Sequence, residues 1–190
     1  EITASAGNPE RERVAIAWES SSGHLLAVGQ PASSFNIVSK EFTTIWSAAT
    51  TFQCSDTTNN IRWLSLKPNP SPGADDMVIA VGDPESDLNT CYWTGSAWAN
   101  RNLHDAAIDS ADGRAFDFAW EESGSKGLLV YGTTAGQITY RTFTAPNTWG
   151  TVTNGAMGAN THPWVELRTN PRVGGVKILG AVLEATANDR

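Results

Sequence analysis

Hydrophobic and polar residues alternate along short stretches of this chain, which is the period of a half-buried β-strand. Val14, Ile16 and Trp18 alternate with alanines, and Ile138 and Tyr140 alternate with polar neighbours. β-Branched and aromatic residues dominate these stretches, and Gly, Pro, Asn and Asp cluster between them, where turns need them. No stretch longer than about ten residues follows the helical period. The pattern therefore predicts an all-β protein.

Two sequence motifs each occur twice. The segment 13–19, which contains Trp18, matches 115–121, and the tryptophans Trp18 and Trp120 lie 102 residues apart. The segment 63–70 matches 164–171, and its tryptophans Trp63 and Trp164 lie 101 residues apart. Two independent anchors with nearly the same offset indicate an internal repeat.

These four tryptophans also divide the chain into shorter units of similar layout. Each unit has a Trp strand, an apolar strand, a Tyr/Phe strand and a turn with a second tryptophan; these turn tryptophans are Trp46, Trp98 and Trp149. Antiparallel units of this size are typical of β-propeller blades. We predict about four blades of three to four short strands, at about 10–53, 60–103, 113–153 and 161–190, in one repeat domain or fragment spanning 1–190.

The tryptophans have two interpretations. A blade buries its faces against its neighbours, so we expect the strand tryptophans Trp18, Trp63, Trp120 and Trp164 to be buried at equivalent positions. The turn tryptophans either join this packing or form exposed platforms on which a sugar stacks.

The fourth unit lacks the last strands that the second unit has, so we expect an unpaired strand edge there. Other protein subunits, the rest of a longer chain or the N-terminal residues 2–5 would supply the missing strand. We favour the first two, because the segment 1–7 is poor in apolar residues.

Charge and composition exclude some partners. The net charge is -7 and basic residues do not cluster, so a nucleic acid would be repelled. Apolar runs are too short for a bilayer, so we expect no membrane insertion in this segment. The low charged fraction, 17%, and a first residue other than Met fit a processed, exported protein or an excised fragment. We expect an extracellular or cell-surface location.

Two cysteines, Cys54 and Cys91, leave two readings open. They form a disulfide if the protein is exported, or they are buried free thiols. Neither has a Cys or His neighbour at metal-ligand spacing, so we expect no zinc site.

Residues with catalytic potential do not form a recognisable set. The histidines His24, His104 and His162 fall in unrelated contexts, and known catalytic motifs are missing. Glu19 and Glu121 recur directly after a strand Trp. They either bond turn amides at the strand end or face a ligand where loops gather. We therefore expect no enzymatic activity and no catalytic residue.

Acidic residues surround one turn of the second unit. Asp83, Glu85 and Asp87 supply the oxygen ligands that Ca²⁺ prefers, but their spacing fits no calcium-loop template. They remain a weak calcium candidate, and we expect no other cofactor.

Four stretches resemble repeats of exported bacterial and archaeal proteins that are surface or adhesin-like and sometimes pilin-associated. The stretches are 17–23, 95–98, 127–132 and 140–142. The resemblance implies a Trp-containing propeller-type repeat with a structural or adhesive role. Fucose-binding propeller lectins are similar in style, and Arg141 is the strand arginine that fits the Arg–Glu pair of their sites.

The sequence thus predicts a non-enzymatic extracellular binding or structural module of a surface or adhesin-like assembly. The alternative is a carbohydrate-binding propeller lectin, and a glycan-processing enzyme ranks third. Candidate ligand-binding residues are Glu19, Glu121, Trp46, Trp98, Trp149 and Arg141.

Overall fold

The computed structural model describes residues 11–31, 36–55, 60–99, 101–110, 113–155, 160–172, 174–175 and 177–185. Within these residues every regular element is a strand, and all paired strands are antiparallel, which confirms the all-β prediction. The possible pairing of residues 2–5 with the last unit lies outside the described residues.

In the described part of the chain the strands form four sheets, and each strand pairs with its neighbour in sequence except β13, which pairs with β11. The first sheet contains β1 (Val14–Trp18), β2 (Leu25–Gly29), β3 (Ile37–Phe42) and β4 (Thr50–Phe52). The second contains β5 (Trp63–Pro68), β6 (Met77–Gly82), β7 (Leu88–Trp93) and β8 (Asn102–Asp105). The third contains β9 (Phe116–Trp120), β10 (Lys126–Gly132), β11 (Ile138–Thr144), β12 (Thr148–Trp149) and β13 (Thr153–Asn154). The fourth contains β14 (Thr161–Thr169) and β15 (Ile178–Ala185).

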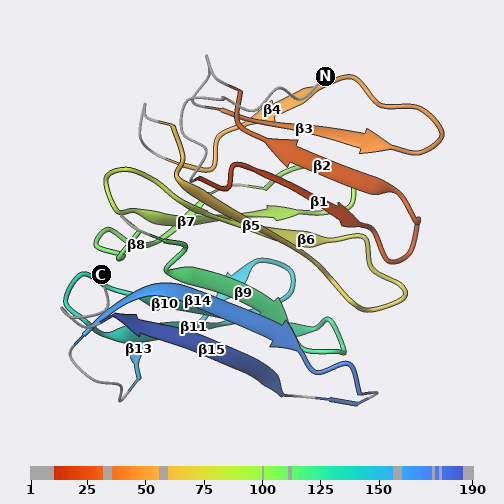
Figure 1. Ribbon diagram of the computed structural model, residues 1–190. Coiled ribbons are helices and arrows are strands. Elements are labelled where there is room, and N and C mark those ends of the chain that lie inside the picture. Colours follow the sequence, from red (N-terminus) through yellow and green to blue (C-terminus); the bar gives the residue numbers. More distant parts are fainter. Residues whose placement is uncertain are drawn as a thin grey trace.

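The four sheets stack face to face in chain order, from the first in red and orange to the fourth in blue (Figure 1). Their first strands contact one another in the same order: β1 contacts β5, β5 contacts β9, and β9 contacts β14. The first strand of every sheet therefore lies at a common inner edge, and the later strands follow outward as antiparallel neighbours joined by turns.

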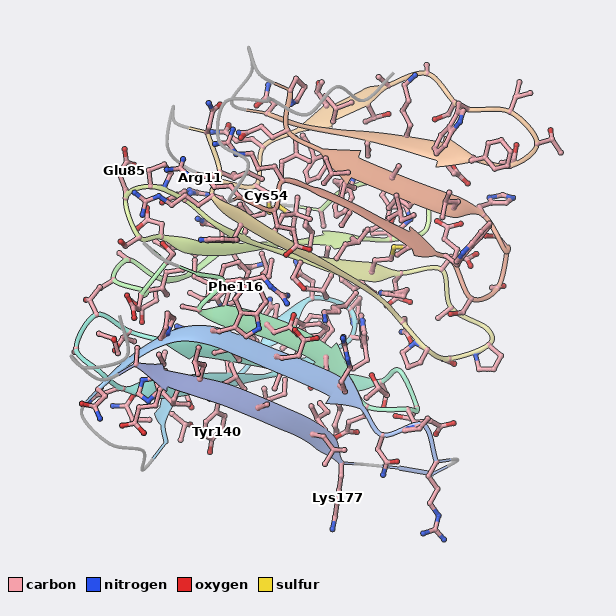
Figure 2. The ribbon with its side chains drawn as sticks, viewed as in Figure 1. Arg11, Cys54, Glu85, Phe116, Tyr140 and Lys177 are labelled. Carbon is pink, nitrogen blue, oxygen red and sulfur yellow. A yellow bond between two sulfur atoms is a disulfide. The ribbon has the colours of Figure 1, made fainter. Side chains whose placement is uncertain are left out.

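Three apolar layers fill the spaces between the sheets. Leu26 and Val28 pack against Leu64 and Ile79 between the first and second sheets. The layer between the second and third sheets is aromatic and contains Trp63, Tyr92, Phe116, Phe118, Trp120 and Phe143. Figure 2 shows Phe116 in this layer. A smaller layer, which includes Val165 and Leu167, joins the third and fourth sheets. The hydrophobic core is thus divided among the contacts between sheets.

Cys54 and Cys91 form a disulfide, with Cα atoms 5.8 Å apart. Cys54 follows β4, the last strand of the first sheet, and Cys91 lies in β7, the third strand of the second (Figure 2). The bond therefore ties the outer part of the first sheet to the second.

The four strand tryptophans do not share one environment, and the expectation of equal burial is wrong for two of them. Trp63 and Trp120 are buried, whereas Trp18 is 60% exposed and Trp164 is 38% exposed. Trp18 lies on the side of the first sheet that faces away from the second, and no described sheet covers that side. Trp164 lies on β14, the inner strand of the fourth sheet, which is the last described sheet in the stack.

Candidate functional site

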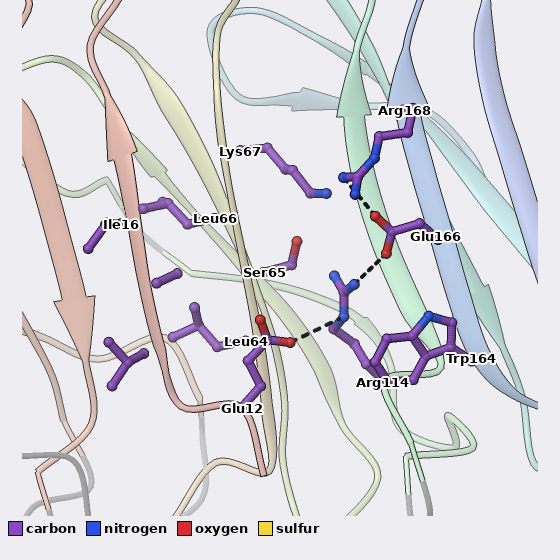
Figure 3. A pocket seen from close by; sticks show the side chains of 12 residues that line it. Glu12, Ile16, Leu64, Ser65, Leu66, Lys67, Arg114, Trp164, Glu166 and Arg168 are labelled. Atoms are coloured by element: carbon purple, nitrogen blue, oxygen red, sulfur yellow. Dashed lines mark hydrogen bonds and ion pairs between the residues drawn. The ribbon is translucent and has the colours of Figure 1, made fainter.

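An open groove of about 470 Å³ runs along the inner strands (Figure 3). We call it the inner-strand groove, and its lining comes from β1, β5, β14 and the residues just before β1 and β9: Glu12, Val14, Ala15, Ile16, Leu64, Ser65, Leu66, Lys67, Arg114, Trp164, Glu166 and Arg168. Residues from the first and fourth sheets thus line the same cavity.

Strand alternation decides which side chains of β14 reach the groove. Val165 and Leu167 pack against the third sheet and are buried. The residues between and beside them, Trp164, Glu166 and Arg168, therefore point to the opposite side. This places an aromatic ring, a carboxylate and a guanidinium in a row along the groove.

Arg114 is the centre of the groove's polar network (Figure 3). Its Nη2 donates to Glu166 Oε2 at 2.6 Å, and its Nη1 donates to Asp117 Oδ1 at 3.0 Å. Its Nε is buried and has no hydrogen-bond partner among the described residues, with Glu12 Oε2 at 3.6 Å. The guanidinium carbon lies 5.3 Å from the ring centroid of Trp164, a cation–π distance.

Asp117 anchors this network below the surface. Its fully buried carboxylate accepts from Ser65 Oγ at 2.7 Å, from Lys67 Nζ at 2.9 Å and from the Leu167 amide at 2.8 Å, besides Arg114. These donors come from β5 of the second sheet, from β14 of the fourth sheet and from the residues just before β9. A carboxylate with this many donors is a structural tie between sheets.

Glu19 and Glu121 have different surroundings, although they occupy equivalent strand ends. Glu19 is buried; its Oε1 accepts from the indole Nε1 of Trp93 at 2.7 Å, and its Oε2 accepts from Ser22 Oγ at 2.5 Å. It therefore joins its own turn to the second sheet. Glu121 is half-buried in the third sheet's first turn, where its backbone bonds Lys126 and Gly124. The structure does not bring these two carboxylates together.

Two of the three turn tryptophans pack between sheets, and the third is more exposed. Trp98 stacks on Phe52 with ring centroids 4.0 Å apart, which links the second sheet to the first. Trp149 meets Phe143 at 4.7 Å and His104 at 4.3 Å, which links the third sheet to the second. Trp46 is about half exposed beside Phe42. Trp46 is therefore the turn tryptophan with the most accessible ring.

Arg141 lies between the second and third sheets, away from the groove. Its Nη2 donates to the His104 carbonyl at 3.4 Å, and its buried Nε has no hydrogen-bond partner among the described residues. Burial, and then the charge of Arg141, lower the pKa of His104 to about 3. The His104 Nε2 bonds the Thr90 hydroxyl at 2.7 Å. Burial also raises the pKa of the nearby Tyr131.

The acidic turn at 83–87 is already organised by its own hydrogen bonds. Oxygens of Asp83, Glu85 and Asp87 lie within 4.8 Å of one another. Asp83 Oδ1 accepts the amides of Glu85 and Asp87 at 3.0 Å each, and its Oδ2 accepts the Ser55 hydroxyl at 2.8 Å. Asp83 thus shapes the turn between β6 and β7, and the three carboxylates of the weak calcium candidate lie close together there.

The groove residues Arg114, Trp164 and Glu166 were not among the predicted site residues. A signal for them exists in the repeat: Glu12 and Arg114 stand directly before the two copies of the first motif, and Glu166 stands where the other motif has Ser65. A change of charge between equivalent positions marks a place where the environments of the two repeats differ.

Neither a protein-family model nor a curated protein sequence matches this chain. A search of solved structures finds AofleA from Arthrobotrys oligospora, crystallised as a variant with three evenly spaced arginines replaced by alanine. The TM-score is 0.54 at 14% sequence identity, over 92% of this chain and 51% of that one. This chain therefore spans about half the length of AofleA. The likeness establishes the fold alone. In the described residues we find no helix long and apolar enough to cross a membrane.

Proposed function

We propose that this chain is a non-enzymatic structural and binding module of an extracellular surface assembly. It forms consecutive blades of a β-propeller and docks further blades through the open faces of its first and fourth sheets. The observation that carries the proposal is that both end faces of the stack carry exposed rows of apolar side chains.

The first outer face consists of Val14, Ile16 and Trp18 on β1, and all three are exposed, Ile16 by 64%. The last outer face consists of Leu179 and Leu183 on β15 with Trp164 beside Leu183 on β14. Leu179 is 67% exposed. Contiguous apolar residues in such exposed rows mark interaction surfaces rather than ordinary solvent-facing strands.

Two further observations support the proposal. A disulfide joins the first two sheets, and such bonds persist in oxidising compartments outside the cytosol. The sheets stack in chain order from a common inner edge, which is how propeller blades are arranged (Figure 1). AofleA, the solved structure of similar fold, has a chain about twice as long.

The proposal requires that the outer faces serve docking and not folding of the chain itself. We expect Ile16→Glu to change the free energy of unfolding by less than about 0.5 kcal/mol, because the side chain already faces water. Phe118→Glu, at the equivalent position of the third sheet, should unfold the chain because it buries an unpaired charge. Thermal unfolding followed by circular dichroism in dilute protein compares the two. Equal destabilisation by both substitutions would mean that the chain covers its own first face.

The inner-strand groove supports a second candidate function, the binding of a saccharide. Trp164 offers a partly exposed ring, and the ion pair between Arg114 and Glu166 lies beside it in the lining of the groove. An aromatic platform beside fixed polar groups suits a sugar ring with one apolar face.

The two candidate functions make opposite demands on Trp164, because a docked blade would cover it as Trp63 is covered. A glycan array, followed by titration of intrinsic tryptophan fluorescence, tests the saccharide candidate. Trp164→Ala should abolish any binding found, whereas Trp46→Ala, which removes an exposed ring outside the groove, should leave it unchanged. Binding that survives Trp164→Ala would exclude the groove.

A further inference from the structure

The first outer face repeats one side of an interface that already exists inside the molecule. In β1, Val14, Ile16 and Trp18 pair with Gly29, Ala27 and Leu25. In β9, Phe116, Phe118 and Trp120 pair with Tyr131, Leu129 and Gly127 in the same register. The three β9 side chains pack against the second sheet. The exposed residues of β1 thus occupy the positions that, in β9, are packed against the second sheet.

The last outer face repeats the other side of that interface. Trp63 pairs with Gly82 and Lys67 pairs with Val78 in the second sheet. Trp164 pairs with Leu183 and Arg168 pairs with Leu179 in the fourth, again in the same register. The positions of the second sheet that receive the third are thus repeated, exposed, on the fourth sheet.

Side-chain volumes at the two end faces compensate each other. Inside the molecule, Gly82 leaves room for Phe116: a Cβ on Gly82 would lie 2.7 Å from the Phe116 ring. On the open faces the large and small residues are exchanged. Leu183 stands at the place of Gly82, and Val14 stands at the place of Phe116. A small residue opposite a large one keeps the same packing in both contacts.

The exposed arginine of the last outer face does not oppose such a contact. Arg168 of the fourth sheet is equivalent to Lys67 of the second. Ala15 of the first sheet is equivalent to Asp117 of the third, so Arg168 would find no carboxylate at that position of the partner. Arg168 Nη1 instead pairs with Glu166 Oε1 on its own strand at 2.7 Å, and its side chain stays largely exposed. Arg168 therefore keeps a partner, Glu166, when the face is covered.

We propose that the partner of these faces is a second copy of this chain. The first outer face of each copy packs on the last outer face of the other, which makes two identical head-to-tail contacts. This inference rests on the proposed function, and it adds the identity of the partner. Residues of both outer faces line the inner-strand groove, so sheets placed between them continue the stack around the same inner edge. Such a heterologous contact gives a closed ring when its rotation closes.

Size-exclusion chromatography with light scattering on the 190-residue chain tests the proposal. We expect a dimer of twice 20.3 kDa. Ile16→Glu alone and Leu183→Glu alone should each give monomers. Each substitution alters the same face in both copies, and each of the two contacts uses that face once. Mixing the two monomers should restore a dimer, since one unaltered contact remains possible between them. Leu103→Glu, an exposed position on β8, is the control and should remain dimeric.

A volume swap sharpens the test. Val14→Phe should weaken the dimer by at least tenfold, because the larger ring would clash with Leu183 of the other copy. Adding Leu183→Gly should restore it, because the pair then matches Phe116 and Gly82. Circular dichroism verifies that each variant is folded.

A wild-type monomer at about 100 µM, where an interface with a Kd of about 1 µM would be mostly dimeric, would overturn the second copy as partner. A dimer that survives Ile16→Glu, or variants that fail to complement, would do the same. The docking function would still stand if Ile16→Glu leaves unfolding unchanged, so the two failures are distinguishable.

Discussion

The first sheet and the third sheet present the same row of positions to opposite environments. Trp18 and Trp120 share a motif and a register, yet Trp18 is 60% exposed and Trp120 is 1% exposed. Ile16 and Phe118 differ in the same way. The third sheet has the second sheet beside it, whereas no described sheet lies beyond the first. Burial in this fold is thus a property of the neighbouring sheet and not of the strand.

The largest expected effect separates the two tryptophans. Trp120→Ala should lower the free energy of unfolding by about 3–5 kcal/mol, because it opens a cavity among Phe118 and Phe143 and removes the bond from its indole to the Lys67 carbonyl. Trp18→Ala should cost below about 1 kcal/mol in dilute protein. Urea unfolding measures both, and similar losses would refute the comparison.

Loss of the buried Asp117 carboxylate at the inner edge should lower the free energy of unfolding nearly as much as loss of Trp120. Asp117→Asn should cost about 3–5 kcal/mol, since Lys67 and Arg114 lose a buried carboxylate. Ala15 occupies the equivalent position of β1, so Ala15→Ser is a matched control with an expected change below about 0.5 kcal/mol. Denaturant unfolding of both variants checks this. A mild effect of Asp117→Asn would mean that the apolar layers alone hold the third and fourth sheets.

The disulfide should matter for the first sheet more than for the third. Replacing Cys54 and Cys91 together by serine should cost about 2–4 kcal/mol, because the unfolded chain regains the freedom of a closed loop. Hydrogen exchange followed by mass spectrometry should show the added opening in β3 and β4. Uniform loss of protection, including β9 to β11, would show that the stack unfolds as one unit.

The smallest expected effect is a pH dependence that arises at the contact between the second and third sheets. The pKa of His104 is lowered from 6.5 to about 3 by burial and by Arg141. The unfolded chain therefore binds the proton first as the pH falls, so this contribution to stability is complete above pH 6.5 and declines below it. The loss should reach about 2 kcal/mol at pH 5. Urea midpoints between pH 7 and pH 5 measure it, and His104→Gln should flatten the dependence. A slope unchanged by His104→Gln would assign it to other groups.

Much of the fold was accessible from the sequence, because strands with period two and repeated tryptophans reflect local and nearest-neighbour packing. The site was less accessible. Arg114, Trp164 and Glu166 come from two sheets, and they meet Lys67 from a third only because the inner strands lie side by side. Glu19, a predicted ligand residue, proved to be bonded to Trp93 across a sheet contact.

The sequence by itself determined the all-β class, the offset of the repeat and the equivalence of the tryptophan positions. These follow from side-chain alternation and turn chemistry, which act over a few residues. Only the tertiary structure decided which equivalent positions are buried, whether the two cysteines meet and which charged groups share a groove. Those properties depend on how whole sheets pack against one another, and a repeated motif has the same local pattern whether or not another sheet covers it.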